Sequence, residues 1–274
     1  MMRFPTFHLA PPSPGEIRRV LWRGPAAIVS YNLEPDDRHP VNAWLYLCAN
    51  REYALDKLPP PMRRNVRRGL KELRIEPITC DQVLDYGFQA FCDSIRRIGL
   101  REETPEQFRR YFTWRAGCPG HVFLGAWKDE KLAGFLSIPK VDDWAEIEGP
   151  FSLDALLNLR VNDTLLFYAL SRYLSEGLCR VVSYGLSSIQ GVSNKAGLHV
   201  FKTKVGFEAR PVHRAFVLHP LIRPFANRLT LWSVNAMLRF RPRDRRLKKV
   251  GGVLACVLGD GRILEMEEEN ISDE

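Results

Sequence analysis

The sequence lacks the features that mark several large classes of protein. Its six cysteines are scattered and form no Cys-x-x-Cys pair, which argues against a zinc site or a disulfide framework and favours small core thiols in a reducing compartment. The six histidines show no metal-ligand spacing. No apolar run reaches the roughly 18 residues of a membrane span, and the first residues carry no apolar signal-peptide segment. These absences predict a cytoplasmic protein without a bound metal.

The composition is that of a globular protein with an excess of positive charge. Hydrophobic residues make up 45% and charged residues 26% of the 274 residues, which excludes global disorder. The net charge is +8 and the pI is near 9.3. Such a balance favours an anionic partner, which could be a nucleic acid, a phosphorylated cofactor or a lipid surface.

The order of predicted elements indicates an α/β fold. Alternating apolar residues predict strands at 26–31, 43–49 and 74–78, with a helix at 62–73 between the last two. Asp81 is expected to cap a helix, and Thr104, Pro105 and Gln107 form a capping-box start for another. Downstream we expect an antiparallel meander at 121–127, 132–138 and 144–151, a helix capped by Asn162-Asp163-Thr164, a strand at 180–184, a helix at 197–205 and a strand at 207–219. This order predicts a mixed sheet flanked by helices.

Three segments carry a family resemblance. They are Phe123-Leu124-Gly125-Ala126-Trp127 with Leu132-Ala133-Gly134-Phe135, then Val182-Ser183-Tyr184-Gly185, and finally Gly197-Leu198-x-x-Phe201-Lys202-x-x-x-Gly206-Phe207. In this order they resemble GNAT-superfamily acyltransferases, most of all the Fem-type and related polysaccharide-modifying branch. The resemblance implies a GNAT-like, mostly antiparallel mixed sheet in residues 79–219. It also implies that residues 1–78, with their basic helix, form a partial, truncated GNAT-like lobe.

The acyl-CoA signature of the superfamily is missing. An Arg/Gln-x-x-Gly-x-Gly/Ala loop would open the helix after the third strand, whereas this chain has Leu157-Asn158-Leu159-Arg160-Val161-Asn162 there. The Fem-type branch also tends to lack the loop, so the fold expectation stands. The donor stays open between acyl-CoA, with acetyl-CoA first, and a charged tRNA.

Acyl transfer needs a group that accepts the proton of the nucleophile and one that protonates the leaving group. Glu146 and Glu148 lie two residues apart in one predicted strand, so they share a face. We expect one of them, Glu148 ahead of Glu146, to be the base, although exposed strand glutamates often serve only solubility. Tyr184 at the end of the next strand is the candidate acid, and an ordinary sheet aromatic is the alternative.

A donor with phosphate groups needs cationic or N–H-rich contacts. The start of the helix near residue 162 offers free backbone N–H groups, so we expect Arg160, Asn162 and Thr164 to bind the donor. Ordinary helix capping is the alternative. Ser187 and Lys202 join the candidates through the resemblance, and a solvated lysine would explain Lys202 equally well.

Two basic clusters predict contact with an anionic partner. The helix at 62–73 carries Arg63, Arg64, Arg67, Arg68 and Lys71, and spacings of three and four place the last four on one face. A second cluster runs from Arg239 to Lys249 and follows an apolar stretch that includes Phe225, Trp232 and Phe240. Such a basic extension, residues 220–264, suits a tRNA or the inner membrane surface, or it packs on the transferase domain. Residues 265–274 are expected to be an acidic, disordered tail.

The sequence therefore predicts an acyltransferase that moves an acyl group from acyl-CoA to an amine or hydroxyl. Fem-like aminoacyl transfer from charged tRNA to a cell-wall or lipid acceptor is the alternative within enzymes. A non-catalytic RNA- or membrane-binding module on the same fold is the alternative of another class.

Overall fold

The computed structural model describes residues 1–24, 26–187, 195–242 and 244–259. Their strands join one mixed sheet in the order β1-β2-β10-β3-β9-β7-β6-β5-β4, with β8 paired to β6. The strands are β1 (Met2–Arg3), β2 (Ile28–Leu33), β3 (Ala43–Cys48), β4 (Arg74–Ile78), β5 (His121–Lys128), β6 (Lys131–Val141), β7 (Trp144–Glu146), β8 (Glu148–Ser152), β9 (Val181–Leu186) and β10 (Glu208–Leu218). The predicted α/β fold with a mixed, mostly antiparallel sheet is confirmed.

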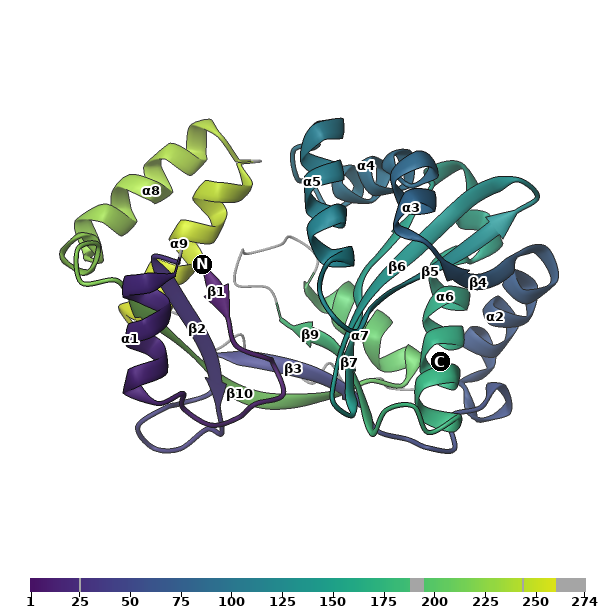
Figure 1. Cartoon of the computed structure of the whole chain (residues 1–274), viewed down its shortest axis with the longest axis horizontal. Helices are drawn as coiled ribbons and strands as arrows, with labels where there is room; N and C mark the ends of the chain where they lie inside the picture. The colour runs from purple at the N-terminus through teal and green to yellow at the C-terminus, as the bar shows by residue number, and fades with distance from the viewer. Residues whose placement is uncertain (25, 188–194, 243, 260–274) are drawn as a thin grey trace, which may run out of the picture.

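Helices cover both faces of this sheet (Figure 1). The α-helices are α1 (Pro14–Arg23), α2 (Pro60–Glu72), α3 (Cys80–Tyr86), α4 (Phe88–Arg97), α5 (Pro105–Ala116), α6 (Val161–Leu170), α7 (Lys195–Val205), α8 (Arg228–Phe240) and α9 (Arg245–Val257). Short helical turns occupy η1 (Leu55–Lys57), η2 (Asp154–Leu159), η3 (Ser171–Ser175) and η4 (Arg223–Phe225). Within the described residues, none of these helices is long and apolar enough to cross a bilayer.

The helical segment after β4 differs from the prediction in its cap and in its continuity. Thr79, and not Asp81, caps α3, because the Thr79 side chain and Gln82 form a capping box. Gly87 then separates α3 from α4, so the predicted single helix is two. The predicted capping box at Thr104 and Gln107 is confirmed at the start of α5.

The larger core lies between the sheet and α2, α6 and α7. It includes Leu136 and Ile138 of β6 and Leu165 and Leu166 of α6, all fully buried. The opposite face holds an aromatic cluster under α3, α4 and α5, where Phe112 packs edge-on against Phe135 with ring centroids 5.3 Å apart. These two layers fix the central strands that carry the candidate site.

The close approach of α2 and α6 depends on a glycine. A Cβ atom added to Gly69 of α2 would lie 1.8 Å from Oγ1 of Thr164 and 3.1 Å from the carbonyl oxygen of Leu159. Thr164 is fully buried at this contact. Because only glycine leaves room for the neighbouring backbone, α2 is held against the first turns of α6.

The sheet divides at Ile147. β7 runs parallel to β9 as far as Glu146 and Ser183, and the N–H of Ile147 donates to the carbonyl of Ser183 at 2.7 Å. Beyond this point β8 pairs with β6, whereas β9 continues against β3. We call this divergence the fork. The predicted third strand of the meander is therefore broken into β7 and β8.

The domain boundaries expected from the sequence, after residues 78, 219 and 264, stay predictions. Strands from both sides of residue 78 join the same sheet, with β3 between β9 and β10. The helices α8 and α9 form a hairpin in the predicted extension, and α9 packs on β10. The predicted acidic tail, residues 265–274, lies outside the described residues.

Candidate functional site

Lys202 of α7 is a buried cation at the end of β9. Only 2% of its surface is exposed. Its Nζ lies 3.9 Å from the ring centroid of Tyr46 and 4.5 Å from that of Tyr184, and it donates a hydrogen bond of 3.3 Å to the carbonyl of Tyr184. We call these three residues the lysine cage. Tyr46 lies at the point where the register between β3 and β9 shifts, between Leu45 and Leu47.

The cage changes the protonation of its members. Burial lowers the pKa of Lys202 from 10.5 to about 7, although the negative charge of Glu146 works in the opposite direction. Burial also raises the pKa of Tyr184 far above its usual value, so the phenol stays protonated. A buried amine whose pKa is lowered towards neutral pH is a candidate functional group.

The geometry of the cage also admits a purely structural role for Lys202. The ammonium has three donors, and the carbonyl of Tyr184 occupies one of them. Two aromatic rings supply cation–π attraction in place of water. The resemblance pointed to Lys202 as a donor-binding residue, whereas its burial and its altered pKa emerged only from the structure.

Glu146 lies on the other face of the sheet, beside the fork. Its carboxylate accepts hydrogen bonds from Arg3 at 2.6 Å and from Oγ1 of Thr6 at 2.8 Å. Gly185 has a φ of +70°, and a Cβ atom added there would lie 3.4 Å from Oε1 of Glu146. The left-handed backbone at Gly185 therefore brings the end of β9 close to this carboxylate.

Glu148 has different partners, although it leaves the sheet on the same side as Glu146. Its Oε2 accepts from Nε of Arg115 at 2.6 Å and from Oγ of Ser137 at 3.5 Å. The Nε2 of His121 lies 2.8 Å from the same Ser137 oxygen, and burial lowers the pKa of His121 to about 4. Of the two predicted bases, Glu148 is held in a side-chain network, and Glu146 is the one near the lysine cage.

Sequence reasoning missed a second buried cation on this face. Arg214 of β10 is only 8% exposed, and its Nε has no hydrogen-bond partner within the part of the chain that the structure describes. Burial and the nearby Arg3 lower its pKa to about 10, whereas Glu146 raises it. Polar and apolar residues do not alternate regularly along β10. The sequence pattern therefore gave no sign that Arg214 is buried.

The start of α6 differs from the predicted cap. The helix begins at Val161, and Arg160 occupies the cap position with a left-handed φ of 62° and no side-chain capping bond. Thr164 is not available to a ligand, because its Oγ1 donates to the carbonyl of Arg160 at 2.9 Å and its side chain is buried under Gly69. The predicted cap at Asn162-Asp163-Thr164 is therefore wrong, because the cap lies two to four residues earlier, at Arg160.

A pocket of about 450 Å³ does lie at this helix start. We call it the α6 pocket. Its lining includes Pro61 and Asn65 of α2, Arg160 and Asn162 at the start of α6, and Phe201 and Lys204 of α7. The Oδ1 of Asn162 is buried without a hydrogen-bond partner among the residues described.

The charges around the α6 pocket are mixed. Arg160 and Lys204 are exposed cations at its rim. Asp163 also lines the pocket, accepts a hydrogen bond of 2.9 Å from Asn65, and has a pKa raised by burial. Its charge opposes a phosphate unless the Asn65 contact or protonation offsets it.

Ser187 is bound to the sheet. Its N–H donates to the carbonyl of Trp44 at 2.7 Å, and its Oγ accepts from the N–H of Trp44 at 3.0 Å. The structure thus places Tyr184 and Lys202 together at the end of β9, with Glu146 on the opposite face of the sheet at the end of β7. It places Arg160 and Asn162 together in the α6 pocket, and leaves Glu148, Thr164 and Ser187 in structural contacts.

The predicted basic face of α2 is present. Arg64, Arg67, Arg68 and Lys71 are exposed and, with Arg63, line a groove of about 540 Å³ along the helix. Among the residues that the structure describes, no group of His, Cys, Asp or Glu side chains could hold a metal ion.

No protein-family model matches the sequence, and a comparison with curated protein sequences finds no match either. The solved structures that are similar to this chain share its fold, that of GNAT-type proteins with a Fem-like arrangement. One is FemX, with a TM-score of 0.57 and 10% identity over 77% of this chain and 77% of that one. Another is the C-terminal domain of a protein from Agrobacterium fabrum that carries the name lysylphosphatidylglycerol synthetase. Its TM-score is 0.51 at 19% identity, covering 74% of this chain and 72% of that one.

Proposed function

We propose that the protein is an acyltransferase that moves an acyl group from a phosphate-bearing donor to an amine or hydroxyl acceptor. The observation that carries the proposal is the lysine cage, a buried amine with a pKa of about 7 at the end of β9. A GNAT-type fold similar to that of FemX adds the reaction class by analogy. The α6 pocket and the basic face of α2 supply cations for the donor.

In the proposed reaction the acceptor attacks the acyl carbon, a new C–N or C–O bond forms, and the bond to the sulfur or oxygen of the donor breaks. At neutral pH Lys202 is present in both protonation states, because its pKa is about 7. It can therefore stabilise the oxyanion as an ammonium, or accept the proton of the acceptor as an amine.

Tyr184 and, from the opposite face of the sheet beside the fork, Glu146 complete the proposed site. Glu146 would orient the acceptor amine or take its proton, with Arg3 and Thr6 holding the carboxylate. Tyr184 keeps its proton because burial raises its pKa, so its hydroxyl would donate a hydrogen bond to the leaving group. Arg214, buried beside Glu146, would pair with an anionic group of the acceptor.

Two donors share the required chemistry. Acyl-CoA, acetyl-CoA before others, would place its phosphates in the α6 pocket at Arg160 and Lys204. A charged tRNA would in addition follow the exposed arginines of α2, which extend along a groove beyond the pocket. The absence of a glycine-rich loop before α6 and the row of exposed arginines on α2 favour the charged tRNA.

Donor binding separates these possibilities. We would measure the affinity for acetyl-CoA and for total charged tRNA with the wild type, with Arg160→Ala plus Lys204→Ala, and with Arg64→Ala plus Arg67→Ala. An acyl-CoA enzyme would bind acetyl-CoA and lose affinity only with the pocket variant. A tRNA-dependent enzyme would bind charged tRNA with a strong dependence on salt, and would lose affinity with the α2 variant too.

A third result would contradict the proposal. Binding of uncharged RNA as tight as that of charged tRNA, without consumption of either donor, would identify a non-catalytic RNA-binding module on this fold.

A further inference from the structure

The outward face of α8 is apolar. Leu229, Trp232, Ala236 and Phe240 follow one another at spacings of three, four and four residues, so they form one stripe along the helix. Leu229 is 72%, Trp232 68% and Phe240 87% exposed. We call this stripe the outer face of α8.

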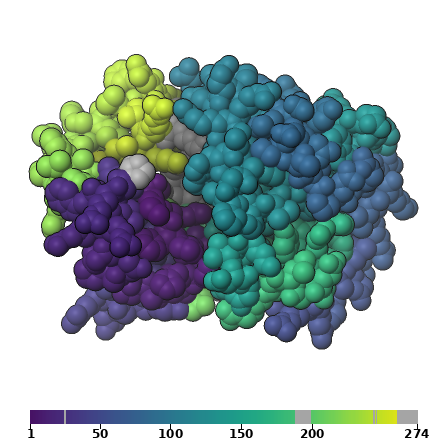
Figure 2. Space-filling model, in the orientation of Figure 1, coloured from purple at the N-terminus to yellow at the C-terminus, as the bar shows by residue number. Residues whose placement is uncertain are grey.

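The other side of α8 is the side that packs on the protein. Val234 is buried, and the glycine backbone of α9 at Gly251 approaches its side chain. Since α8 packs on α9, and α9 packs on β10, the residues that the structure describes anchor the helix through the face that carries Val234. Figure 2 shows α8 at one end of the molecule, adjoining α1.

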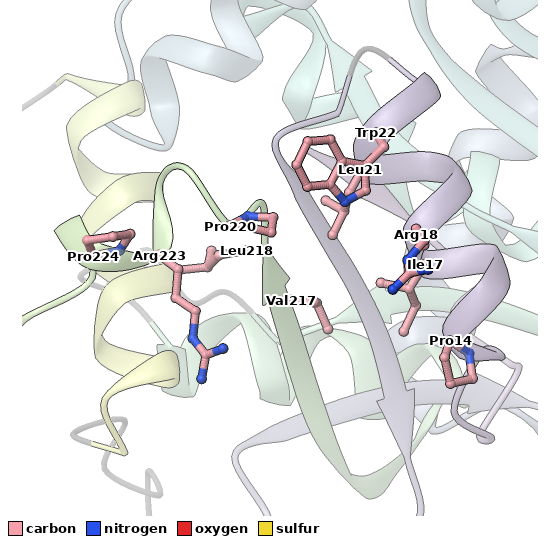
Figure 3. Close-up of a pocket in the computed structure, with 10 residues that line it drawn as sticks. All are labelled: Pro14, Ile17, Arg18, Leu21, Trp22, Val217, Leu218, Pro220, Arg223 and Pro224. Carbon is pink, nitrogen blue, oxygen red and sulfur yellow. The ribbon is translucent and has the colours of Figure 1, made fainter.

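The apolar surface continues towards α1. Leu221 and Phe225, in the segment that leads into α8, are also strongly exposed. A pocket of about 840 Å³ separates this segment from α1. Figure 3 shows Ile17, Leu21 and Trp22 on one side of the pocket, and Val217, Leu218 and Pro220 on the other.

Positive charge borders this apolar surface. The segment from His219 to Arg241 contains four arginines and no aspartate or glutamate. Arg239 and Arg241 at the end of α8 are exposed, as is Arg223 beside the pocket. Apolar and aromatic side chains rimmed by arginines are the composition of helices that lie in the plane of a membrane interface.

We propose that the outer face of α8, together with Leu221, Phe225 and Trp22, docks the protein on a membrane surface that contains anionic lipids. The aromatic and aliphatic side chains enter the boundary between headgroups and acyl chains, and the arginines contact lipid phosphates. The pocket between α1 and the segment before α8 has the apolar lining and the arginines, Arg18 and Arg223, to receive part of one lipid.

The charge pattern favours a membrane over two other occupants. A symmetric dimer through this surface would bring arginines of one copy against a face of the other that carries arginines and no carboxylate, since residues 219–241 contain no aspartate or glutamate. A nucleic acid would need cations at the centre of its contact surface, where this face has Leu229, Trp232 and Phe240.

The test is co-sedimentation of the full chain with vesicles of phosphatidylcholine alone or mixed with phosphatidylglycerol. We expect binding to the mixed vesicles that weakens as salt is added. Trp232→Ser with Phe240→Ser should reduce binding on the order of a hundredfold, because two aromatic side chains no longer enter the interface. Arg239→Glu with Arg241→Glu should reduce it by at least about thirtyfold.

Two matched controls make the result specific. Trp114 of α5 is exposed to the same degree as Trp232, at 67%, so Trp114→Ser should leave vesicle binding unchanged. Arg64→Glu with Arg68→Glu changes the net charge by the same amount on α2, at the opposite end of the molecule (Figure 1). This pair should retain most of the binding.

Other results would overturn the proposal. Vesicle binding that survives the loss of Trp232 and Phe240, or that follows the α2 pair, would show that the outer face of α8 is not the docking surface. A wild-type dimer in sedimentation velocity that Trp232→Ser with Phe240→Ser converts to a monomer would identify the face as an interface between copies. The variants change exposed side chains, so circular dichroism should show an unaltered fold. Vesicle binding does not depend on acyl transfer, so its failure would leave the proposed reaction untouched.

Discussion

Replacement of Lys202 by methionine is expected to make the protein more stable at neutral and low pH. Methionine has a similar length and no charge, so it fills the lysine cage without the cost of burying an ammonium. In the folded protein burial holds the pKa of Lys202 near 7, against 10.5 for the free side chain. Between these two pH values the unfolded chain binds one more proton than the folded protein does.

The sign and size of the effect follow from that difference. The free energy of unfolding of the wild type should rise with pH from about 7 to about 10.5, because protonation favours the unfolded state in that window. At about 1.4 kcal/mol for each unit of pKa, the full cost below pH 7 is roughly 5 kcal/mol. Methionine forfeits the two cation–π contacts, so we expect a net gain of about 2 to 4 kcal/mol.

The assay is urea unfolding of wild type and Lys202→Met at about pH 6, 8 and 10. The gap between the two should be largest at the lowest pH and should close at the highest. Lys204→Met is the control, because Lys204 is exposed on the same helix and its removal takes away one charge without relieving burial. A stability difference between the two proteins that stays constant across the pH range would show that Lys202 is not buried with a lowered pKa. A variant less stable than the wild type at every pH would show the same.

Three further predictions concern stability. Gly69→Ala should destabilise the protein by about 1 to 3 kcal/mol, because the new Cβ atom collides with Thr164; combination with Thr164→Ala should recover part of the loss in urea unfolding, and strict additivity would argue against the contact. On acidification from about pH 6.5 to 4, stability should fall, since the unfolded chain protonates His121 before the folded protein does; His121→Gln should flatten that part of the profile, and an unchanged profile would contradict the assignment. Arg214→Met should be neutral or stabilising by about 1 kcal/mol without ligand; a loss of several kcal/mol would mean that the guanidinium is already paired in the folded protein.

The fold was predictable because its signals are local. Two apolar runs on either side of the polar turn at 128–131 located β5 and β6, and the capping box at Thr104 located the start of α5. The division of the third meander strand at Ile147 was not predictable, because it depends on which neighbours β7 and β8 find in the sheet. Asp81 was expected as the cap because aspartate is a strong N-cap residue, whereas the capping box between Thr79 and Gln82 makes Thr79 the cap in the structure.

The candidate site was predictable only in part. Lys202, Tyr184 and Glu146 were named from motif and strand position. The structure brings Lys202 and Tyr184 into contact at the end of β9 and places Glu146 at the end of β7, on the opposite face of the sheet. Alternation could not show that Glu148 is paired with Arg115 on α5, or that Thr164 is buried by Gly69 on α2, since both contacts join distant segments. Arg214 carried no signal at all, because burial of an arginine is a property of the assembled fold.

The most direct test of the account is donor consumption in a single turnover. Labelled acetyl-CoA and labelled aminoacyl-tRNA would each be mixed with excess protein, with an amine or hydroxyl acceptor panel present, using wild type, Lys202→Met and the exposed-lysine control Lys131→Met. We predict that the wild type and Lys131→Met discharge one of the donors, at a rate that depends on a group with a pKa of about 7, and that Lys202→Met does so far more slowly. Equal discharge by Lys202→Met, or no discharge of either donor by the wild type at any pH, would contradict it.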